Sequence, residues 1–150
     1  MPTSLSYELH KLTARLDRLA DALLSRQFGV SYARFLSLFA IREGALSQRE
    51  LARWLGQSEP STSRMVSVLA QEELLQVTTV AGMGNRRRLQ LTDAGAELVE
   101  RCGRLLEDRF DELVRHSGVP YLAYQRHTRR LLDQLEAEQS SGVPNPQAST

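Results

Sequence analysis

Two short helical stretches separated by only three residues most constrain how this chain folds. Residues 47–56, where Gly56 closes the helix, and residues 59–73 both carry apolar residues at helical spacing, and the three-residue connection from Gly56 to Ser58 includes that closing glycine. Gly56 is suited to end the first helix, and Ser58 is suited to cap the second. Pro60 then stands in the first turn, where proline is favoured. The stretch therefore predicts a helix-turn-helix motif.

The second helix of this motif is too polar on one side to lie wholly within a core. Its predicted buried face consists of Thr62, Met65, Val66 and Leu69. The opposite face, near the N-terminal end, consists of Pro60, Ser61, Ser63, Arg64 and Ser67. Such a helix can enter the major groove of DNA, where a guanidinium pairs bidentately with guanine. We therefore expect the second set to reach bases or nearby phosphates, and Ser47 and Gln48 of the preceding helix to contact the DNA backbone.

A two-stranded hairpin is predicted directly after the motif. Residues 74–80 are rich in Val, Thr and Leu, a turn with two glycines follows, and residues 86–91 predict the returning strand. No acidic residue occurs in this hairpin, so its arginines have no local partner. We expect Arg86, Arg87 and Arg88 to bind phosphate or to enter a minor groove. A helix-turn-helix followed by such a hairpin is a winged helix.

Four further helices are predicted, at residues 4–28, 31–42, 92–116 and 120–138. Thr92 is expected to cap the third of them. We predict a mainly α-helical single domain, residues 1–139, with the winged helix-turn-helix at about 45–92. Residues 140–150 are rich in Ser, Gly and Pro, and predict a short disordered tail.

From Gly29 to Gly95 the sequence resembles the MarR family of bacterial transcriptional regulators. The matching residues are Ser31-Tyr32-Ala33, Leu36, Leu38, Leu46-Ser47-Gln48, Glu50-Leu51-Ala52, Leu55-Gly56, Ser58, Ser63-Arg64, Leu69, Leu74, Leu91-Thr92 and Ala94-Gly95. Two departures matter. Glu73 stands where the family usually has a Gly that ends the recognition helix, and the family's charged wing-tip pattern falls on the uncharged residues 83–85. The resemblance implies a DNA-binding regulator, often a repressor of adjacent or divergent genes.

The first helix carries leucines in alternating steps of four and three residues, which is a narrow heptad seam. For a single helix, packing on its own domain is the commoner outcome. In the resembling family, however, the leading and trailing helices build a dimer interface, and here they correspond to about 4–28 and 95–138. We therefore predict a homodimer that binds a palindromic duplex. Its interface is expected to include Leu5, Leu9, Leu12, Leu16, Leu131 and Leu135.

The resemblance also implies a small, often aromatic and anionic, effector that weakens DNA binding. Its crevice is expected between the dimerisation helices and the winged part, near His10, Arg15, Tyr32 and Phe35. Aromatic surface beside an Arg and a His suits a carboxylate or a phenolate. Ordinary core aromatics and a solvated Arg are nevertheless the commoner roles of such residues taken one by one.

Other chemistry is not indicated. Cys102 is the only cysteine; it excludes an intrachain disulfide and is interpreted as an inert buried thiol. His10, His116 and His127 are scattered without a ligand cluster, and there is no Gly-rich phosphate loop or nucleophile–base set. We therefore expect no metal, no cofactor and no enzymatic activity. Trp54, the single tryptophan, is expected in the core behind the recognition helix.

The remaining composition bounds the partners and the compartment. The net charge of +1 argues against indiscriminate coating of nucleic acid, but not against a localised basic surface. The sequence has no long apolar run and no secretory pattern at its start, which predicts a cytoplasmic protein. Two rival classes stay open: a winged-helix module that binds protein instead of DNA, and an enzyme whose site the sequence does not reveal.

Overall fold

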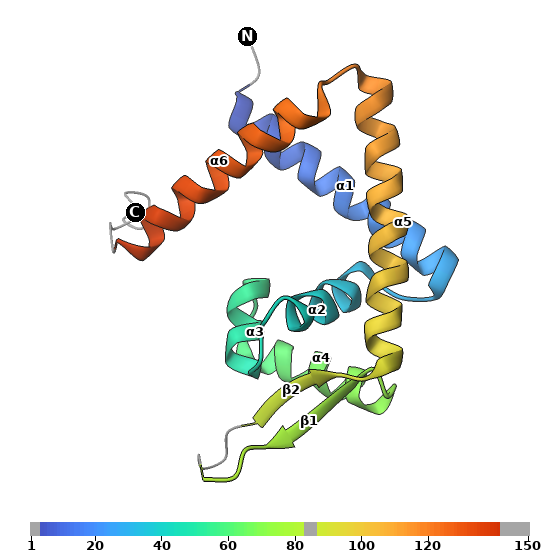
Figure 1. The fold of residues 1–150 in the computed structure, drawn as a ribbon, viewed down its shortest axis with the longest axis vertical. Helices are drawn as coiled ribbons and strands as arrows, with labels where there is room; N and C mark the ends of the chain where they lie inside the picture. Colours follow the sequence, from blue (N-terminus) through green and yellow to red (C-terminus); the bar gives the residue numbers. More distant parts are fainter. Residues whose placement is uncertain (1–3, 83–86, 142–150) are drawn as a thin grey trace. The chain divides into compact units, whose positions relative to one another are not determined.

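The computed structural model describes residues 4–82 and 87–141. In chain order its elements are α1 (Leu5–Phe28), α2 (Tyr32–Arg42), α3 (Gln48–Leu55), α4 (Glu59–Gln71), β1 (Leu75–Thr79), β2 (Arg87–Leu91), α5 (Asp93–Ser117) and α6 (Tyr121–Ser140) (Figure 1). The predicted mainly α-helical fold with a winged helix-turn-helix is confirmed. The chain divides into two compact units, Met1–Leu106 and Glu107–Thr150.

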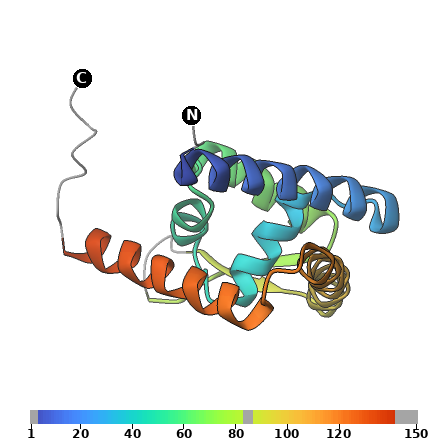
Figure 2. The same ribbon diagram turned by 90° about the horizontal axis from the view of Figure 1, so that it is seen from above.

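Helix α2 is the centre of the first unit, because it contacts α1, α3, α4 and β2. The chain turns back from the end of α1 into α2 (Figure 2). Phe35, Leu38 and Ile41 of α2 are buried, and the rings of Phe35 and Phe39 lie 5.8 Å apart. Around them pack the buried side chains of Leu24, Leu51, Leu69, Leu89 and Val99. These residues come from five different elements, so the winged part has a single continuous core.

Serine caps define where three of the helices begin. The hydroxyls of Ser31, Ser47 and Ser58 each accept a hydrogen bond from the backbone N–H three residues later, at 3.2, 3.1 and 3.3 Å. Each bond satisfies a donor that has no partner within its own helix. Gly56 ends α3 in the left-handed conformation, with φ +62°. The predicted start of α4 and end of α3 are therefore confirmed.

The end of α4 differs from the prediction. The helix stops at Gln71 instead of continuing to Glu73. Glu73 has a φ of +58°, a left-handed conformation that glycine adopts more easily than any other residue. The chain thus makes at Glu73 a left-handed turn of the kind that glycine favours, but with a side chain that opposes it.

The hairpin is antiparallel, and Leu75 pairs with Leu91 at its base. Leu89 faces inward and is buried, and its N–H donates to the carbonyl oxygen of Leu46 at 2.8 Å. This bond fastens β2 to the segment that leads into α3. The wing is therefore held to the helix-turn-helix by backbone as well as by packing.

Trp54 does not lie in the core, so the expectation for this residue is wrong. Its side chain is 56% exposed. Helix α3 buries the face that carries Leu51, Ala52 and, in part, Leu55. Trp54 lies about 60° outside that face at 100° per residue, which follows from 3.6 residues per turn. Its size suggested burial, but its position on the helix decides the outcome.

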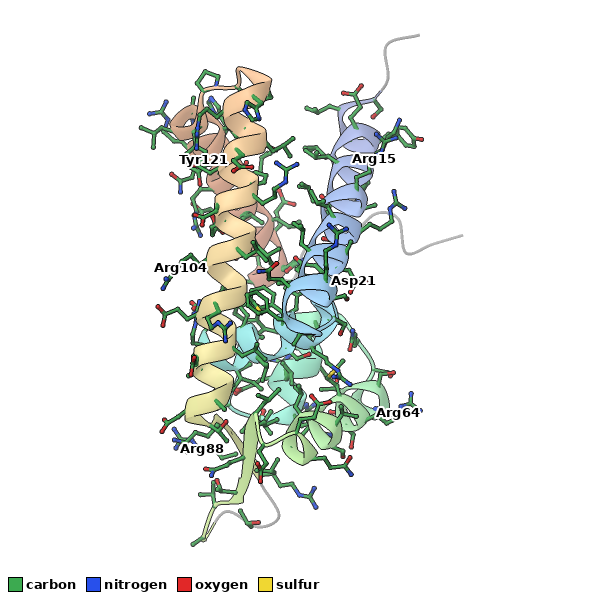
Figure 3. All side chains as sticks on the ribbon, turned by 90° about the vertical axis from the view of Figure 1, so that its right-hand side faces the viewer. Arg15, Asp21, Arg64, Arg88, Arg104 and Tyr121 are labelled. Atoms are coloured by element: carbon green, nitrogen blue, oxygen red, sulfur yellow. The ribbon has the colours of Figure 1, made fainter. Side chains whose placement is uncertain are left out.

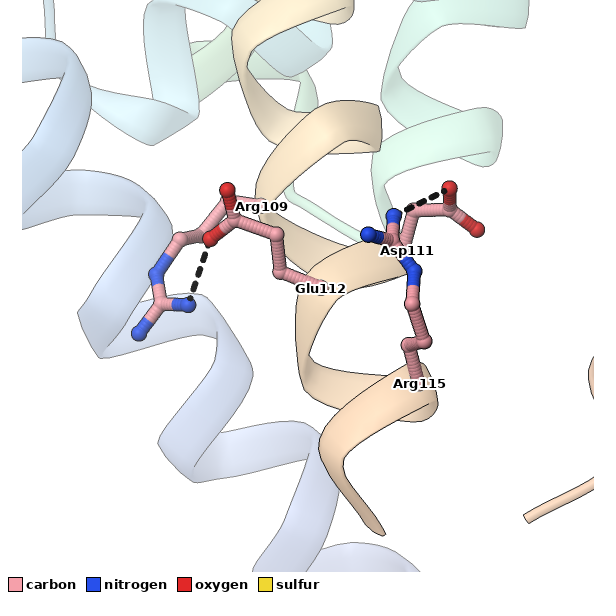
Figure 4. A network of polar contacts seen from close by, with 4 residues as sticks. All are labelled: Arg109, Asp111, Glu112 and Arg115. Atoms are coloured by element: carbon pink, nitrogen blue, oxygen red, sulfur yellow. Dashed lines mark hydrogen bonds and ion pairs between the residues drawn. The ribbon is translucent and has the colours of Figure 1, made fainter. Parts of the chain in front are cut away.

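The second unit contains the end of α5 and all of α6. Between them Gly118 adopts a φ of +76°, as a helix-ending glycine does. In this part of α5, Arg109 pairs with Glu112 at 3.1 Å and Arg115 pairs with Asp111 at 3.3 Å (Figure 4). In each pair the two partners lie one helical turn apart and are exposed. Each pair therefore contributes only about 0.3–0.5 kcal/mol to the stability of the fold.

Helix α6 has no buried residue, although it carries several large apolar side chains. Leu122, Leu131, Leu132 and Leu135 are all exposed. The helix extends to Ser140, and residues 142–150 of the predicted tail lie outside the described part of the chain. Within the described ranges, no helix combines the length and the apolar character needed to cross a membrane.

Candidate nucleic-acid interface

The buried face of α4 fixes how this helix is presented. Thr62, Val66 and Leu69 are buried and Met65 is half-buried, as predicted. The Thr62 hydroxyl donates to the carbonyl oxygen of Ser58 at 3.0 Å, so a polar group is buried without losing its partner. With this face anchored, the rotation of α4 about its axis is set.

The opposite face of α4 is open to solvent. Pro60, Arg64 and Ser67 are exposed, while Ser61 and Ser63 are half-buried. The Ser58 hydroxyl donates to the Ser61 hydroxyl at 3.0 Å, and the guanidinium of Arg64 donates to the same oxygen at 3.3 Å. The structure therefore brings the predicted α4 residues together as one surface of hydroxyls around a single guanidinium.

Arg64 has no carboxylate within ion-pair distance in the described residues. Figure 3 shows its side chain pointing away from α4 into solvent. A guanidinium offers five donors in a rigid fork, which matches the two acceptors of guanine in the major groove. The arrangement is thus chemically suited to base readout, with the nearby hydroxyls suited to phosphate oxygens.

The start of α3 places Ser47 and Gln48 at the turn before the buried part of that helix. Both are half-buried. The Ser47 oxygen is already used as an acceptor for the Glu50 N–H, which leaves its own hydrogen free to donate. Glu50 in turn accepts from the Leu46 N–H at 2.9 Å, so this turn is held from both sides. The turn at the start of α3 therefore presents hydrogen-bond donors, such as the Ser47 hydroxyl, which a contact with phosphate requires.

The wing carries two described arginines. Arg87 pairs across the hairpin with Thr79, Arg88 pairs with Thr78, and both arginines are exposed. Successive residues of a strand point to opposite faces, so the two guanidiniums leave the hairpin in different directions. Figure 3 shows Arg64 and Arg88 well apart on opposite sides of the winged part. Arg86, the third predicted contact, lies outside the described residues.

The predicted effector site is only partly assembled. The rings of Tyr32 and Phe35 lie 6.2 Å apart, but Phe35 is 7% exposed and belongs to the core. The Tyr32 N–H donates to the carboxylate of Asp21 at 2.9 Å. His10 is exposed on α1, eleven residues or about 16 Å along the helix before Asp21, so it lies far from this hydrogen bond.

The electrostatics near Tyr32 also differ from the expectation. Burial raises the pKa of the Tyr32 phenol, and the negative charge of Asp17 raises it further. Arg15 is exposed and lies six residues, about 9 Å, before Asp21 on α1. The described neighbours of Tyr32 on α1 thus include two carboxylates, those of Asp17 and Asp21. Sequence spacing alone did not reveal these two acidic neighbours.

The leucines predicted for a dimer interface are largely uncovered in the single chain. Leu5 is 69% exposed, Leu9 and Leu12 are each 38% exposed, and Leu16 is half-buried. In the second unit, a shallow cavity of about 180 Å³ lies beside α6. It is lined by Phe110, Tyr121, Tyr124, Gln125, Thr128, Arg129 and Leu132. Large apolar side chains exposed in this way are typical of surfaces that another chain covers.

Cys102 is buried, as expected for a structural thiol. Burial raises the pKa of its thiol, and the nearby charge of Arg101 opposes this shift only in part. The Arg101 guanidinium itself lies 5.0 Å from the centre of the Phe28 ring. Among the described residues, no group of three His, Cys, Asp or Glu side chains is arranged to hold a metal ion.

Comparison with known protein families identifies the central motif. The family of the IclR helix-turn-helix domain matches residues 33–78, which is less than a third of the chain. This match spans α3, α4 and nearly all of α2 and β1, so it includes the helix-turn-helix but not β2, which carries Arg87 and Arg88. No curated protein matches the sequence.

Solved structures match nearly the whole chain. The MepR–DNA complex of S. aureus has a TM-score of 0.69 at 22% identity and covers 89% of this chain and 96% of its own. Wild-type apo MarR from E. coli gives 0.72 at 23%, covering 90% and 98%. A MarR/EmrR family transcriptional regulator from Acinetobacter sp. ADP1 gives 0.74 at 18%, covering 91% and 94%. The chain therefore has the winged helix-turn-helix fold of the MarR-type regulators.

Proposed function

We propose that this protein is a homodimeric, sequence-specific DNA-binding regulator of transcription. The observation that carries the proposal is the solvent-facing side of α4, where hydroxyls surround Arg64 while the other side is locked in the core. Arg87 and Arg88 of the wing, which have no ion-pair partner among the described residues, add two further cations apart from this surface. One of the structures with the same fold is MepR in a complex with DNA, which supports the same use of the fold here.

In this proposal α4 enters the major groove. Arg64 pairs with a guanine, and Ser61, Ser63 and Ser67 bind the base edges or phosphates beside it. The start of α3, with Ser47 and Gln48, binds the DNA backbone and fixes the register. The wing arginines bind phosphate or the minor groove, which adds affinity but little sequence preference.

A second copy of the chain completes the DNA-binding unit, which is a homodimer. The exposed leucines of α1 and α6 provide apolar surface for this contact. Two recognition helices related by a two-fold axis must lie about 34 Å apart to enter successive major grooves on one side of the duplex. The DNA target is therefore a palindrome. In the protein, α1 and α6 are the dimerisation helices.

We further propose repression of adjacent genes, relieved by a small aromatic, anionic effector. A ligand that favours another spacing of the two α4 helices lowers DNA affinity by shifting the population of conformations. By linkage, DNA must weaken the ligand by the same factor. Titrating aromatic acids such as salicylate against the protein–DNA complex tests this part. Binding to the free protein with no change in DNA affinity would refute the regulatory role alone.

The proposal is tested by selecting duplexes from random-sequence DNA with the full-length protein. Enrichment of one palindrome, with affinity that falls as salt rises, is the expected result. The main rival is a winged-helix module that binds another protein. For that class the selection yields no palindrome and no salt-dependent duplex binding, and this outcome would refute the proposed function. Turnover of a metabolite by the purified protein would instead favour an enzyme.

A further inference from the structure

A joint of hydrogen bonds connects the end of α4, the base of the hairpin and the start of α5. The Thr92 hydroxyl donates to the carbonyl oxygen of Glu73 at 2.7 Å. The same hydroxyl accepts from the Gly95 N–H at 3.0 Å. The Thr92 N–H donates to the carbonyl oxygen of Leu74 at 3.2 Å. One threonine therefore holds the segment that leaves α4 and the first turn of α5 at the same time.

Close backbone contact makes this joint stiff. A Cβ added at Gly95 would overlap the carbonyl oxygen of Leu74, so the two segments touch without any side chain between them. On the α4 side, Glu73 is held at a φ of +58°. A non-glycine residue keeps that conformation only where its surroundings impose it. The bond from Thr92 to the Glu73 carbonyl is part of those surroundings.

Capping alone does not explain both bonds of Thr92. A helix N-cap needs only an oxygen that accepts from the first turn, and here that acceptor serves the Gly95 N–H. The donated bond goes instead to Glu73, just beyond the end of another helix. Thr92 thus bonds to the ends of two helices. The bond to the Glu73 carbonyl oxygen connects the end of α4 to the start of α5 and has no part in capping α5.

We infer that Thr92 is a positioning residue that fixes the direction of α4 relative to the start of α5, and thereby the half-site spacing that the dimer reads. The inference rests on the proposed function. Helix α4 has 13 residues, so its DNA-reading end lies about 20 Å from the joint. A tilt of about 10° at the joint displaces that end by about 3 Å, close to the rise of one base pair.

Thr92→Asp separates the two bonds, and two other substitutions bracket it. Thr92→Ser keeps the donor and the acceptor and is the matched control. Thr92→Asp keeps an acceptor for the Gly95 N–H, but its carboxylate is ionised at neutral pH and cannot donate to Glu73. Thr92→Val has nearly the same shape and lacks both functions. Thermal unfolding of each variant is measured first. If Thr92→Asp does not fold, Thr92→Val tests the two bonds together, and a spacing profile like that of wild type then overturns the inference.

The probe is the palindromic duplex that the wild-type protein selects, together with versions in which one base pair is inserted or removed between the half-sites. Wild type and Thr92→Ser should lose about tenfold or more in affinity on the altered spacings, as for a mismatched site. Thr92→Asp should bind the selected duplex more weakly and lose most of the spacing preference. The affinity of Thr92→Asp for random duplex DNA should equal that of wild type. A partly unfolded variant would instead bind every duplex more weakly.

Two results overturn the inference. One is a spacing profile of Thr92→Asp that parallels the wild-type profile, because the bond to Glu73 then has no role in positioning. The other is a loss of spacing preference in Thr92→Ser as large as in Thr92→Asp, because the hydroxyl is then not the determinant. Failure of the proposed function is a different observation: the wild-type protein then selects no duplex.

Discussion

The guanidinium of Arg64 donates to the hydroxyl of Ser61, which lies one turn earlier on α4, at 3.3 Å. Ser61 is itself held by Ser58, the cap of the helix. A surface arginine normally loses rotamer freedom when it binds, at a cost of about 0.5–1.5 kcal/mol for such a side chain. In the proposed complex, a contact that already holds Arg64 beside Ser61 in the free chain would lower that cost.

Arg64→Ala should weaken binding to the selected palindrome by about 1–3 kcal/mol and relax the preference at one position in each half-site. Arg64→Lys should lose most of the same preference, because an ammonium does not pair bidentately. Arg104→Ala, an exposed position on α5, is the control and should leave DNA binding unchanged. Equal losses on palindromic and random duplexes would instead make Arg64 a phosphate contact.

The wing arginines should change the salt dependence instead of the sequence preference. Arg87→Ala and Arg88→Ala should each reduce the slope of log affinity against log salt by about one unit, if each neutralises one phosphate. The measurement is a salt series on the selected and the random duplex. A wild-type slope in the variant with Arg86, Arg87 and Arg88 all replaced by Ala would exclude the wing as a DNA contact.

Two glycines of α5 should respond in opposite ways to the same substitution. Gly95→Ala places a Cβ against the Leu74 carbonyl and should lower the free energy of unfolding by at least about 2 kcal/mol. A Cβ at Gly103 meets no atom within 4 Å, so Gly103→Ala should raise it by about 1 kcal/mol through helix propensity. Chemical denaturation measures both. Similar effects at the two positions would contradict the contact.

Glu73→Gly should stabilise the protein by up to about 1 kcal/mol, because glycine adopts a φ of +58° without steric cost. Gln71→Gly is the matched control, since Gln71 is exposed and still helical. That change should destabilise by about 0.5–1 kcal/mol. If both glycines destabilise equally, Glu73 carries no strain in solution.

The buried Cys102 predicts a loss of stability at alkaline pH. Burial raises the pKa of its thiol in the folded state, so the folded protein holds the proton more tightly than the unfolded chain. This contribution is complete below the ordinary thiol pKa of about 8.5 and disappears as pH rises through the higher folded value. Unfolding of wild type and Cys102→Ala at neutral and alkaline pH should converge as pH rises. A constant difference between them would contradict the shift.

Local chemistry made the helix-turn-helix predictable from sequence. The Ser58 cap depends on a hydrogen bond within a few residues, and so does the stop at Gly56. The two faces of α4 follow from helical spacing alone, which placed Thr62 inside and Arg64 outside. These features need no knowledge of distant parts of the chain.

Features that depend on distant residues were not predictable in the same way. Whether Trp54 is buried depends on which face of α3 meets the core, and the size of its side chain gave the wrong answer. The neighbours of Tyr32 come from α1, where Asp17 and Asp21 face it across a helix crossing. The double use of the Thr92 hydroxyl joins residues 19 positions apart, beyond the range of local patterns.

The exposed position of Trp54 also gives the protein a built-in optical label. It is the only tryptophan in the chain, so all indole fluorescence originates from one known place on α3. An indole in contact with water emits at longer wavelength than one in a core, and its emission responds when a neighbouring molecule displaces that water. Contacts made near the helix-turn-helix therefore become visible in the unmodified protein, without a dye and without an added aromatic residue.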